Sequence, residues 1–261
     1  MQLNHARILL TGATGGLGQA LASELSAAGA ALLLSGRDAA RLAAIRVAPG
    51  TDHATLQADL ATGEGIAAAV AVARHFRVNV LINNAGIGCF GLLEQQDWPT
   101  VEQVLATNLE SPMRLTQALL PWLRAQPEAA IVNIGSTFGS IPFAGFAAYS
   151  AAKAGLRAFS QALRRELADS LIRVVHVAPR AIDTPLNAPA VNALNRQLKN
   201  HSDPPAAVAA RIVAILRNGQ AETHLGFPER LFAWLNGVAP GLIDRGLAGK
   251  LAAIKRHASS P

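Results

Sequence analysis

The amino-acid sequence predicts an α/β protein in which a doubly wound parallel sheet is flanked by helices, as a single domain with a C-terminal helical tail. Three observations support this fold class. Short apolar runs alternate with longer amphipathic ones along the 261 residues, 51% of the residues are hydrophobic, and only 5% are aromatic. A core of Ala, Leu, Val and Ile suits helices packed on a sheet, and strand–helix alternation predicts right-handed βαβ units.

The strands are expected where the apolar runs are short and continuous, because such runs suit strands buried on both faces of a parallel sheet. These runs occupy residues 7–12, 31–36, 53–58, 78–84, 129–136 and 172–179. The amphipathic segments between them predict helices at 17–29, 38–47, 62–75, 97–125, 149–169 and 204–218. No repeat, linker or change of composition divides residues 1–227, so one domain is expected there.

Two regions depart from the alternation. Residues 183–203 are polar and rich in Pro and Asn, and loops of this kind commonly form lids over active sites. Residues 228–261 continue past the expected domain as a tail rich in Leu, Phe, Trp and Pro, which is expected to be helical.

Composition excludes several classes of partner. The formal net charge is +6, but no basic block exceeds two residues and basic–aromatic interleaving is absent, so nucleic acid is not expected. The single cysteine, Cys89, excludes an internal disulfide and fits a reducing compartment. The seven histidines lack metal-ligand spacing, so no metal site is expected. Without a signal peptide or an apolar stretch of transmembrane length, the expected location is cytoplasmic.

A glycine cluster, TGATGGLG (11–18), follows the first strand and opens the first helix. Without a Cβ atom, Gly12 can take the tight turn, Gly16 lets a pyrophosphate approach the backbone, and Gly18 allows close packing of helix on strand. The helix N-terminus then offers unpaired N–H groups and the positive end of a dipole to phosphates. In this setting the cluster predicts a dinucleotide site and a Rossmann-type sheet.

The end of the second strand indicates which dinucleotide is bound. The strand ends in Ser35–Gly36 and is followed by Arg37, where dinucleotide-binding folds often have an acidic residue that binds the adenosine 2′-OH. A guanidinium pairs instead with a 2′-phosphate, which a carboxylate would repel. Asp38 is better suited to be the N-cap of the next helix. The sequence therefore favours NADP(H) over NAD(H), with a solvated surface charge as the alternative for Arg37.

Residues 149–153 read YSAAK and contain the only tyrosine of the chain. On a helix, Tyr149 and Lys153 share a face about one turn apart. An ammonium near a phenol favours the phenolate and lowers the pKa of the phenol from ~10 toward neutrality. Such a pair can act as an acid or base.

With these motifs the chain resembles the single-domain branch of the short-chain dehydrogenase/reductase family, over roughly residues 5–227. The family's TGxxxGxG appears as TGATGGLG, its adenine contact as Asp59–Leu60, its NNAG as Asn83–Gly86, its helix asparagine as Asn108, its serine as Ser136 and its YxxxK as Tyr149–Lys153. The resemblance implies a cofactor site made of Gly12, Thr14, Gly16, Leu17, Gly18, Arg37, Asp59, Leu60, Asn83, Ala85, Gly86, Tyr149, Lys153, Pro179, Ile182 and Thr184.

The resemblance also implies roles in reducing a carbonyl. Nicotinamide gives the hydride, Tyr149 gives the proton, and Ser136 hydrogen-bonds the substrate oxygen. Lys153 holds the nicotinamide ribose and, with the charge of the oxidised ring, lowers the pKa of Tyr149. Asn108 positions a water that links Lys153 to solvent.

One residue departs from the family pattern. The family usually has Pro-Gly after the sixth strand, whereas this chain has Pro179–Arg180. Three partners are open for Arg180: the carboxylate of Asp183, the pyrophosphate, or an anionic group on the substrate.

These features predict an NADP(H)-dependent oxidoreductase that acts on a hydrophobic ketone, aldehyde or 3-oxoacyl group. A catalytically silent nucleotide-sensing or scaffold protein of the same fold is the alternative, although such a protein would be expected to lose the tyrosine or the lysine. An extended-branch sugar-nucleotide epimerase or dehydratase would have TGxxGxxG and a larger C-terminal domain, and neither is evident.

Two interpretations of the tail stay open. Its helices pack on the domain or on a partner subunit beside the substrate cleft, or they form an apolar rim for a long substrate and rest weakly on an anionic membrane. Five basic and two acidic residues give the tail a charge of +3. By resemblance, a homodimer or homotetramer is expected through the helices at 97–125 and 149–169.

Overall fold

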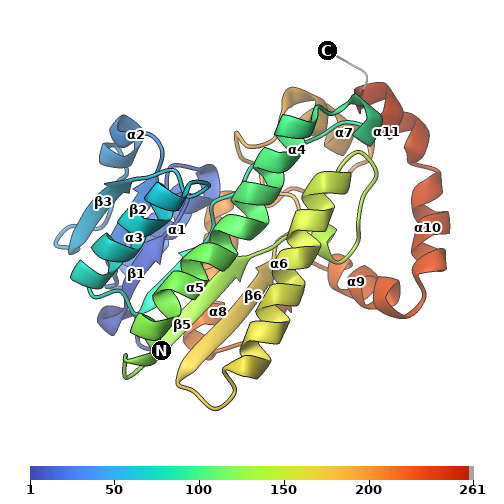
Figure 1. Ribbon diagram of the computed structural model, residues 1–261. Helices are drawn as coiled ribbons and strands as arrows, with labels where there is room; N and C mark the ends of the chain where they lie inside the picture. The colour runs from blue at the N-terminus through green and yellow to red at the C-terminus, as the bar shows by residue number, and fades with distance from the viewer. Residues whose placement is uncertain (259–261) are drawn as a thin grey trace.

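The computed structural model describes residues 1–258, so residues 259–261 of the predicted tail lie outside the described residues. Its centre is a parallel sheet of seven strands in the order β3-β2-β1-β4-β5-β6-β7 (Figure 1). The strands are β1 Arg7–Leu10, β2 Ala31–Gly36, β3 His53–Gln57, β4 Val80–Asn83, β5 Ala129–Ile134, β6 Ile172–Ala178 and β7 Glu222–His224. β1 and β4 are neighbours although β2 and β3 separate them along the chain, and ligands of open α/β sheets bind at such a switch point.

Helices cover both faces of this sheet and continue past it. They are α1 Gly16–Ala27, α2 Ala39–Ala43, α3 Gly63–His75, α4 Trp98–Leu105, α5 Ser111–Arg124, α6 Ala147–Glu166, α7 Pro189–Gln197, α8 Pro205–Asn218, α9 Glu229–Val238, α10 Pro240–Ala248 and α11 Leu251–Ala258. A π-helical turn, Ala106–Glu110, joins α4 to α5. None of the helices within residues 1–258 is long and apolar enough to cross a membrane.

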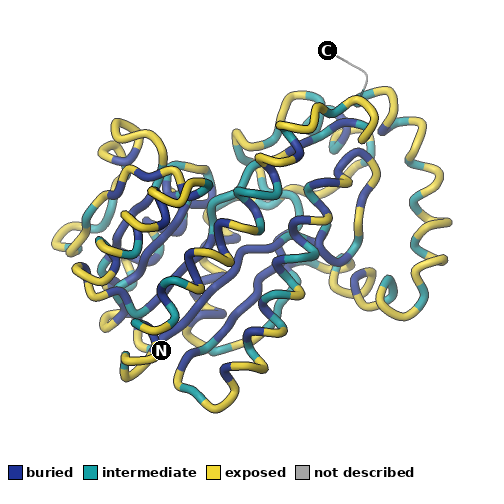
Figure 2. Tube along the Cα trace, viewed as in Figure 1, coloured by how far each residue is buried: buried dark blue, intermediate teal, exposed yellow. Residues whose placement is uncertain are grey.

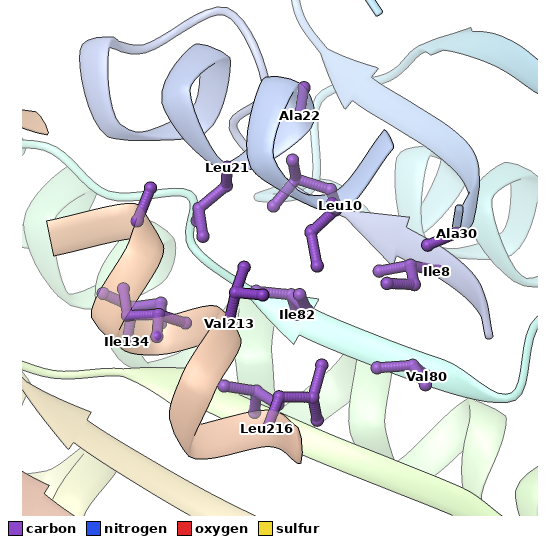
Figure 3. Close-up of a cluster of buried hydrophobic side chains, with 14 of the residues drawn as sticks. Ile8, Leu10, Leu21, Ala22, Ala30, Val80, Ile82, Ile134, Val213 and Leu216 are labelled. Atoms are coloured by element: carbon purple, nitrogen blue, oxygen red, sulfur yellow. The ribbon is translucent and has the colours of Figure 1, made fainter. Parts of the chain in front are cut away.

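The core has two layers because successive strand residues point to opposite faces. Ile8 and Leu10 of β1 pack with α1 and α8 (Figure 3), whereas Leu9 packs in the other layer with α3, α5 and α6. The strands are therefore buried on both faces, as their continuous apolar runs predicted.

The six predicted strands are all present, with ends that differ by up to two residues. The predicted helix at 97–125 is interrupted by the π-helical turn, and Pro112, which has no N–H to donate, lies in the first turn of α5. The sequence analysis missed β7 because Glu222–His224 is short and has no apolar run. It also missed α7, which lies inside the polar segment 183–203 and buries only Leu194.

The two ends of segment 183–203 lie side by side where the segment joins the domain. The amide of Asp203 donates to the carbonyl of Ala181, and the amide of Asp183 donates to the carbonyl of Asp203. Beyond this segment, α9, α10 and α11 form an arc outside the sheet layers (Figure 1), and α11 returns to pack on α7. The middle of the arc, α10, has no buried residue (Figure 2).

Candidate active site

A cavity of about 1210 Å³ extends from the glycine loop, past the ends of β4 and β5, to residues 183–203 and the tail. Fifteen of the sixteen predicted cofactor residues line it: Gly12, Thr14, Gly16, Leu17, Gly18, Arg37, Asp59, Leu60, Ala85, Gly86, Tyr149, Lys153, Pro179, Ile182 and Thr184. The exception is Asn83, which is buried in the sheet and donates to Asn133 Oδ1 at 2.8 Å and Thr116 Oγ1 at 3.3 Å.

The glycine loop is held in a conformation that side chains would obstruct. Gly12 has a φ of 63°, and a Cβ atom there would lie 2.7 Å from Ala85 Cα. A Cβ atom on Gly18 would lie 2.2 Å from the carbonyl oxygen of Gly12. No side chain caps the N-terminus of α1 at Gly15, so its first-turn N–H groups are available to an anion. The loop therefore fits a dinucleotide phosphate.

Two residues that the sequence analysis did not single out fix this loop to the end of β4. Thr11 Oγ1 accepts hydrogen bonds from the amides of Asn84 and Ala85, both at 3.0 Å. Asn84 Nδ2 donates to the carbonyl of Thr11 at 2.9 Å. The two asparagines of the NNAG motif therefore have different surroundings: Asn83 hydrogen-bonds within the sheet, whereas Asn84 lines the cavity.

At the adenosine end, Arg37 is exposed and lines the cavity. Asp38 caps α2 as expected, because its Oδ1 accepts from the amide of Arg41 at 3.0 Å. Arg41 also lines the cavity and donates from Nη2 to the carbonyl of Thr14 at 2.8 Å. The sequence analysis missed this second guanidinium, which the four-residue spacing from Arg37 could have indicated. Two guanidinium groups therefore line the cavity at the end of β2, whereas the neighbouring Asp38 carboxylate is engaged as a helix cap and does not line it.

The predicted acid/base group is assembled where β5 meets α6. Tyr149 is in the first turn of α6, and Lys153 follows one turn later. Ser136 lies two residues after the end of β5, and its side chain hydrogen-bonds Tyr149. Lys153 Nζ donates to the carbonyl of Ile134 at 2.9 Å and lies 5.8 Å from the centre of the Tyr149 ring. These three side chains line the cavity together.

Asn108 lies behind these residues and does not line the cavity. It belongs to the π-helical turn, a rare conformation that often occurs at functional sites. Its Oδ1 accepts from the amide of Ile87 at 2.8 Å, and its Nδ2 donates to the carbonyl of the same residue at 2.9 Å. A Cβ atom on Gly86 would lie 3.1 Å from Asn108 Oδ1 and 3.6 Å from Lys153 Nζ, so both side chains converge on this glycine.

Burial controls the ionisation of the acid/base pair. It raises the pKa of Tyr149 above its usual value, and the hydrogen bond from Ser136 opposes this only in part. It lowers the pKa of Lys153 from 10.5 to about 8. In the protein without cofactor, loss of hydration therefore decides the direction of the Tyr149 pKa, and the lowering expected from Lys153 together with the oxidised nicotinamide ring stays a prediction. A neutral phenol is the form that can donate a proton to a carbonyl.

Arg180 has partners other than those considered from the sequence. Its Nε and Nη2 donate to the two carboxylate oxygens of Asp203 at 2.9 and 2.7 Å, and its Nη1 lies 3.5 Å from Glu229 Oε1. Asp183, one of the three partners left open from the sequence, is not the residue that pairs with Arg180. Because two carboxylates already hold the guanidinium, Arg180 joins the end of segment 183–203 to the start of α9.

The other end of the cavity is apolar and aromatic. Of the eight phenylalanines in the chain, six line it: Phe90, Phe138, Phe143, Phe146, Phe227 and Phe232. Phe138 and Phe146 also contact the Tyr149 ring edge-on, at centroid distances of 6.4 and 6.2 Å. A phenol with a polar partner thus lies at the boundary between a phosphate-binding end and a hydrophobic end of one cavity.

Comparisons with known proteins show which family and fold the chain is similar to. The family model for short chain dehydrogenases matches residues 6–195. A curated relative, dehydrogenase/reductase SDR family member 7B from Bos taurus, is 34% identical over 95% of this chain and 82% of its own length.

Two solved structures show the same fold with bound cofactors. A short-chain dehydrogenase from Sphingobium yanoikuyae in complex with NADPH has a TM-score of 0.79 and 32% identity, covering 92% of this chain and 95% of its own. A 3-ketoacyl-(acyl-carrier-protein) reductase from Brucella melitensis complexed with NADH has a TM-score of 0.78 and 26% identity, covering 87% and 99%. Proteins similar to this chain thus bind either form of the cofactor.

Proposed function

The chain belongs to the short-chain dehydrogenase/reductase family, and on this basis we propose that it is an NADP(H)-dependent oxidoreductase that reduces a hydrophobic ketone, aldehyde or 3-oxoacyl group. One observation carries the proposal. Ser136, Tyr149 and Lys153 meet at the point where a phosphate-binding cavity becomes a phenylalanine-lined one. The silent-protein alternative is weaker, because it gives no reason for an intact acid/base pair at that point.

Each residue of the site has its own role in the proposed carbonyl reduction. When bound, the reduced nicotinamide supplies the hydride. Tyr149, kept protonated by burial, gives its hydroxyl proton to the carbonyl oxygen as negative charge develops there. Ser136 stays hydrogen-bonded to Tyr149 and orients the same oxygen. Lys153 holds the ribose and supplies positive charge beside the phenol, and Asn108 supports the water that returns a proton through Lys153.

Preference for NADP(H) rests on the end of β2. Arg37 and Arg41 both line the cavity there, and the Asp38 carboxylate is engaged as a helix cap. A 2′-phosphate placed between two guanidinium groups gains charge-assisted hydrogen bonds that a 2′-hydroxyl cannot match.

Preference for a hydrophobic substrate rests on the aromatic end of the cavity. Phe138, Phe143 and Phe146 form a cluster of ring contacts next to Tyr149, with centroids 5.0 to 6.4 Å apart. Tail residues such as Phe232 and Leu247 line the same end. The tail therefore serves both as packing and as an apolar wall.

We also propose a weak contact of the tail with anionic membranes. Leu231, Trp234 and Val238 of the tail are each between 48 and 64% exposed, although all are large and apolar, and none of them is among the cavity-lining residues. Exposed apolar side chains next to basic ones are typical of helices that lie in a membrane interface. The cytoplasmic location stays a prediction. So does the homodimer or homotetramer formed through α4, α5 and α6, and sedimentation equilibrium would measure that oligomeric state.

The test of the proposed function is Tyr149→Phe. This change keeps the ring and its contacts but removes the proton donor, so we expect NADPH-dependent turnover to fall to background across a panel of ketones, aldehydes and 3-oxoacyl thioesters. NADPH affinity, followed by cofactor fluorescence, should stay within severalfold. Undiminished turnover in the variant would contradict the mechanism. Stoichiometric NADPH binding by the unmodified protein, without turnover of any panel member, would favour the silent alternative.

A further inference from the structure

The tail forms a strap, residues 229–258, that is attached to the domain at both ends. At the first end, Glu229 pairs with Arg180 and Asn236 Nδ2 donates to the carbonyl of Ser140 at 2.8 Å. At the other end, Ile254 is only 1% exposed and packs in the cluster that contains Phe143 and Phe146. Helix α11 also packs on α7. The strap is therefore fixed at its ends and spans the distance between them.

The middle of the strap, α10, lines the cavity with one of its faces. Leu242, Ile243, Gly246 and Leu247 belong to this face, since residues three and four apart lie on the same side of a helix. Lys250, in the turn between α10 and α11, also lines the cavity, and its Nζ lies 5.9 Å from the centre of the Phe143 ring. The face is thus directed toward the aromatic end of the cavity.

Gly246 has no structural need to be glycine. It is exposed, its φ is not positive, and a Cβ atom there would have no neighbour within 4 Å. This differs from Gly18, where a Cβ atom would collide with the backbone. Glycine inside a helix is less favourable than alanine, so the position loses helix stability without gaining contact. What it provides is a gap between two other cavity-lining residues, Leu242 one turn earlier in α10 and Lys250 four residues later in the turn that follows the helix.

We infer that Gly246 is a specificity-determining position that keeps open the entrance between α10 and Phe143, so that a carbonyl compound with a large apolar part can pass under the strap to Tyr149. The inference rests on the proposed function for the identity of the substrate. It assigns to α10 the selection of substrates by size, while binding of the cofactor takes place at the opposite end of the cavity.

The chain offers a matched control for this inference. Gly237 lies inside α9, is exposed, and also has no atom within 4 Å of a Cβ position, but it does not line the cavity. Gly237→Phe and Gly246→Phe therefore add the same side chain to open space on the same strap. Only the second change fills the entrance.

The experiment compares the two variants with the unmodified protein, using 2-pentanone and 2-undecanone as short and long ketones. We expect the ratio of kcat/KM for the long to the short ketone to fall at least tenfold in Gly246→Phe, and to stay within twofold in Gly237→Phe and Gly246→Ala. Equal ratios in Gly246→Phe and Gly237→Phe would overturn the inference. Circular dichroism and urea unfolding of each variant check that the strap stays helical and the protein folded.

A second readout separates this inference from the proposed function. Nile red, an uncharged apolar dye, is bound to the NADPH-loaded protein, and its association rate is measured by stopped-flow fluorescence. If no ketone is turned over, the proposed function fails, but slower dye entry in Gly246→Phe alone would still support the entrance. Unchanged dye entry in that variant, or no dye binding to the unmodified protein, would overturn it.

Discussion

Lys153→Met is expected to destroy turnover and yet make the cofactor-free protein more stable. Lys153 is 5% exposed, and no carboxylate within residues 1–258 is paired with it. Its single hydrogen bond within the described residues is to the carbonyl of Ile134. A buried ammonium with so few partners destabilises the folded state whenever it is charged, whereas methionine has a similar length and no charge.

The size of the effect follows from two opposing contributions. Lowering the pKa from 10.5 to about 8 corresponds, at about 1.4 kcal/mol per pKa unit, to about 3 kcal/mol of destabilisation by the charged form. Loss of the charged hydrogen bond to Ile134 offsets about 1.5 kcal/mol of this gain. The variant should therefore be more stable by about 1 to 2 kcal/mol at pH 7.

The stability difference between the variant and the unmodified protein should depend on pH. Between about pH 8 and pH 10.5 the unfolded chain binds a proton at Lys153 that the folded chain does not, so the free energy of unfolding of the unmodified protein rises with pH in this window. Below pH 8 the destabilisation is fully present. Other groups titrate in both proteins and cancel in the difference. The advantage of the variant should thus disappear by about pH 10.

The assay is urea unfolding of the cofactor-free proteins at pH 7 and pH 10, followed by circular dichroism. Lys255→Met, which changes an exposed lysine on α11, serves as the control and should leave the free energy of unfolding within about 0.5 kcal/mol. A variant at Lys153 that is less stable at pH 7, or whose difference from the unmodified protein is the same at both pH values, would refute the reasoning.

Two further predictions concern the ends of the cavity. Arg37→Ala should remove most of an expected ten- to hundredfold preference for NADPH over NADH in kcat/KM, because a charge-assisted pair contributes ~1.5–3 kcal/mol; a preference for NADH in the unmodified enzyme would contradict the assignment. The protein should float with phosphatidylglycerol vesicles at low salt and be released at roughly 1 M salt, where the Debye length is ~3 Å. Trp234→Ser should weaken this binding, and absence of flotation at low salt would leave the tail as a wall of the cavity only.

The parts of the fold that the sequence predicts are those fixed by local chemistry. Strands such as β1 and β5 are buried on both faces, so a continuous apolar run is required and sufficient to indicate them. The glycine loop is equally local, because the positive φ of Gly12 and the close approach at Gly18 each require the absence of a side chain. The acid/base pair is predictable for the same reason, since one helical turn fixes the distance between its members.

Other features depend on contacts that the sequence does not display. The π-helical turn that holds Asn108 follows an unremarkable amphipathic segment, and its position is evident only once the amide and carbonyl of Ile87 are seen to pair with the side chain. The direction of the Tyr149 pKa shift likewise depends on burial by Phe138 and Phe146, which the five-residue motif YSAAK does not report. Local spacing indicates which groups meet, but not how much water surrounds them.

Arg180 shows why the substrate end is the hardest part to predict. Asp183 is only three residues away from Arg180 along the chain, but the carboxylate that accepts from the guanidinium is that of Asp203. Asp203 is far along the chain, yet a parallel bridge with Ile182 brings it next to Arg180. Glu229 then joins the same guanidinium from the start of the strap. The substrate end is assembled from the loop after β5, segment 183–203 and the strap, and these are connected by contacts between residues distant in sequence. A motif can consequently identify the reaction in this chain while the shape that selects the substrate is set elsewhere.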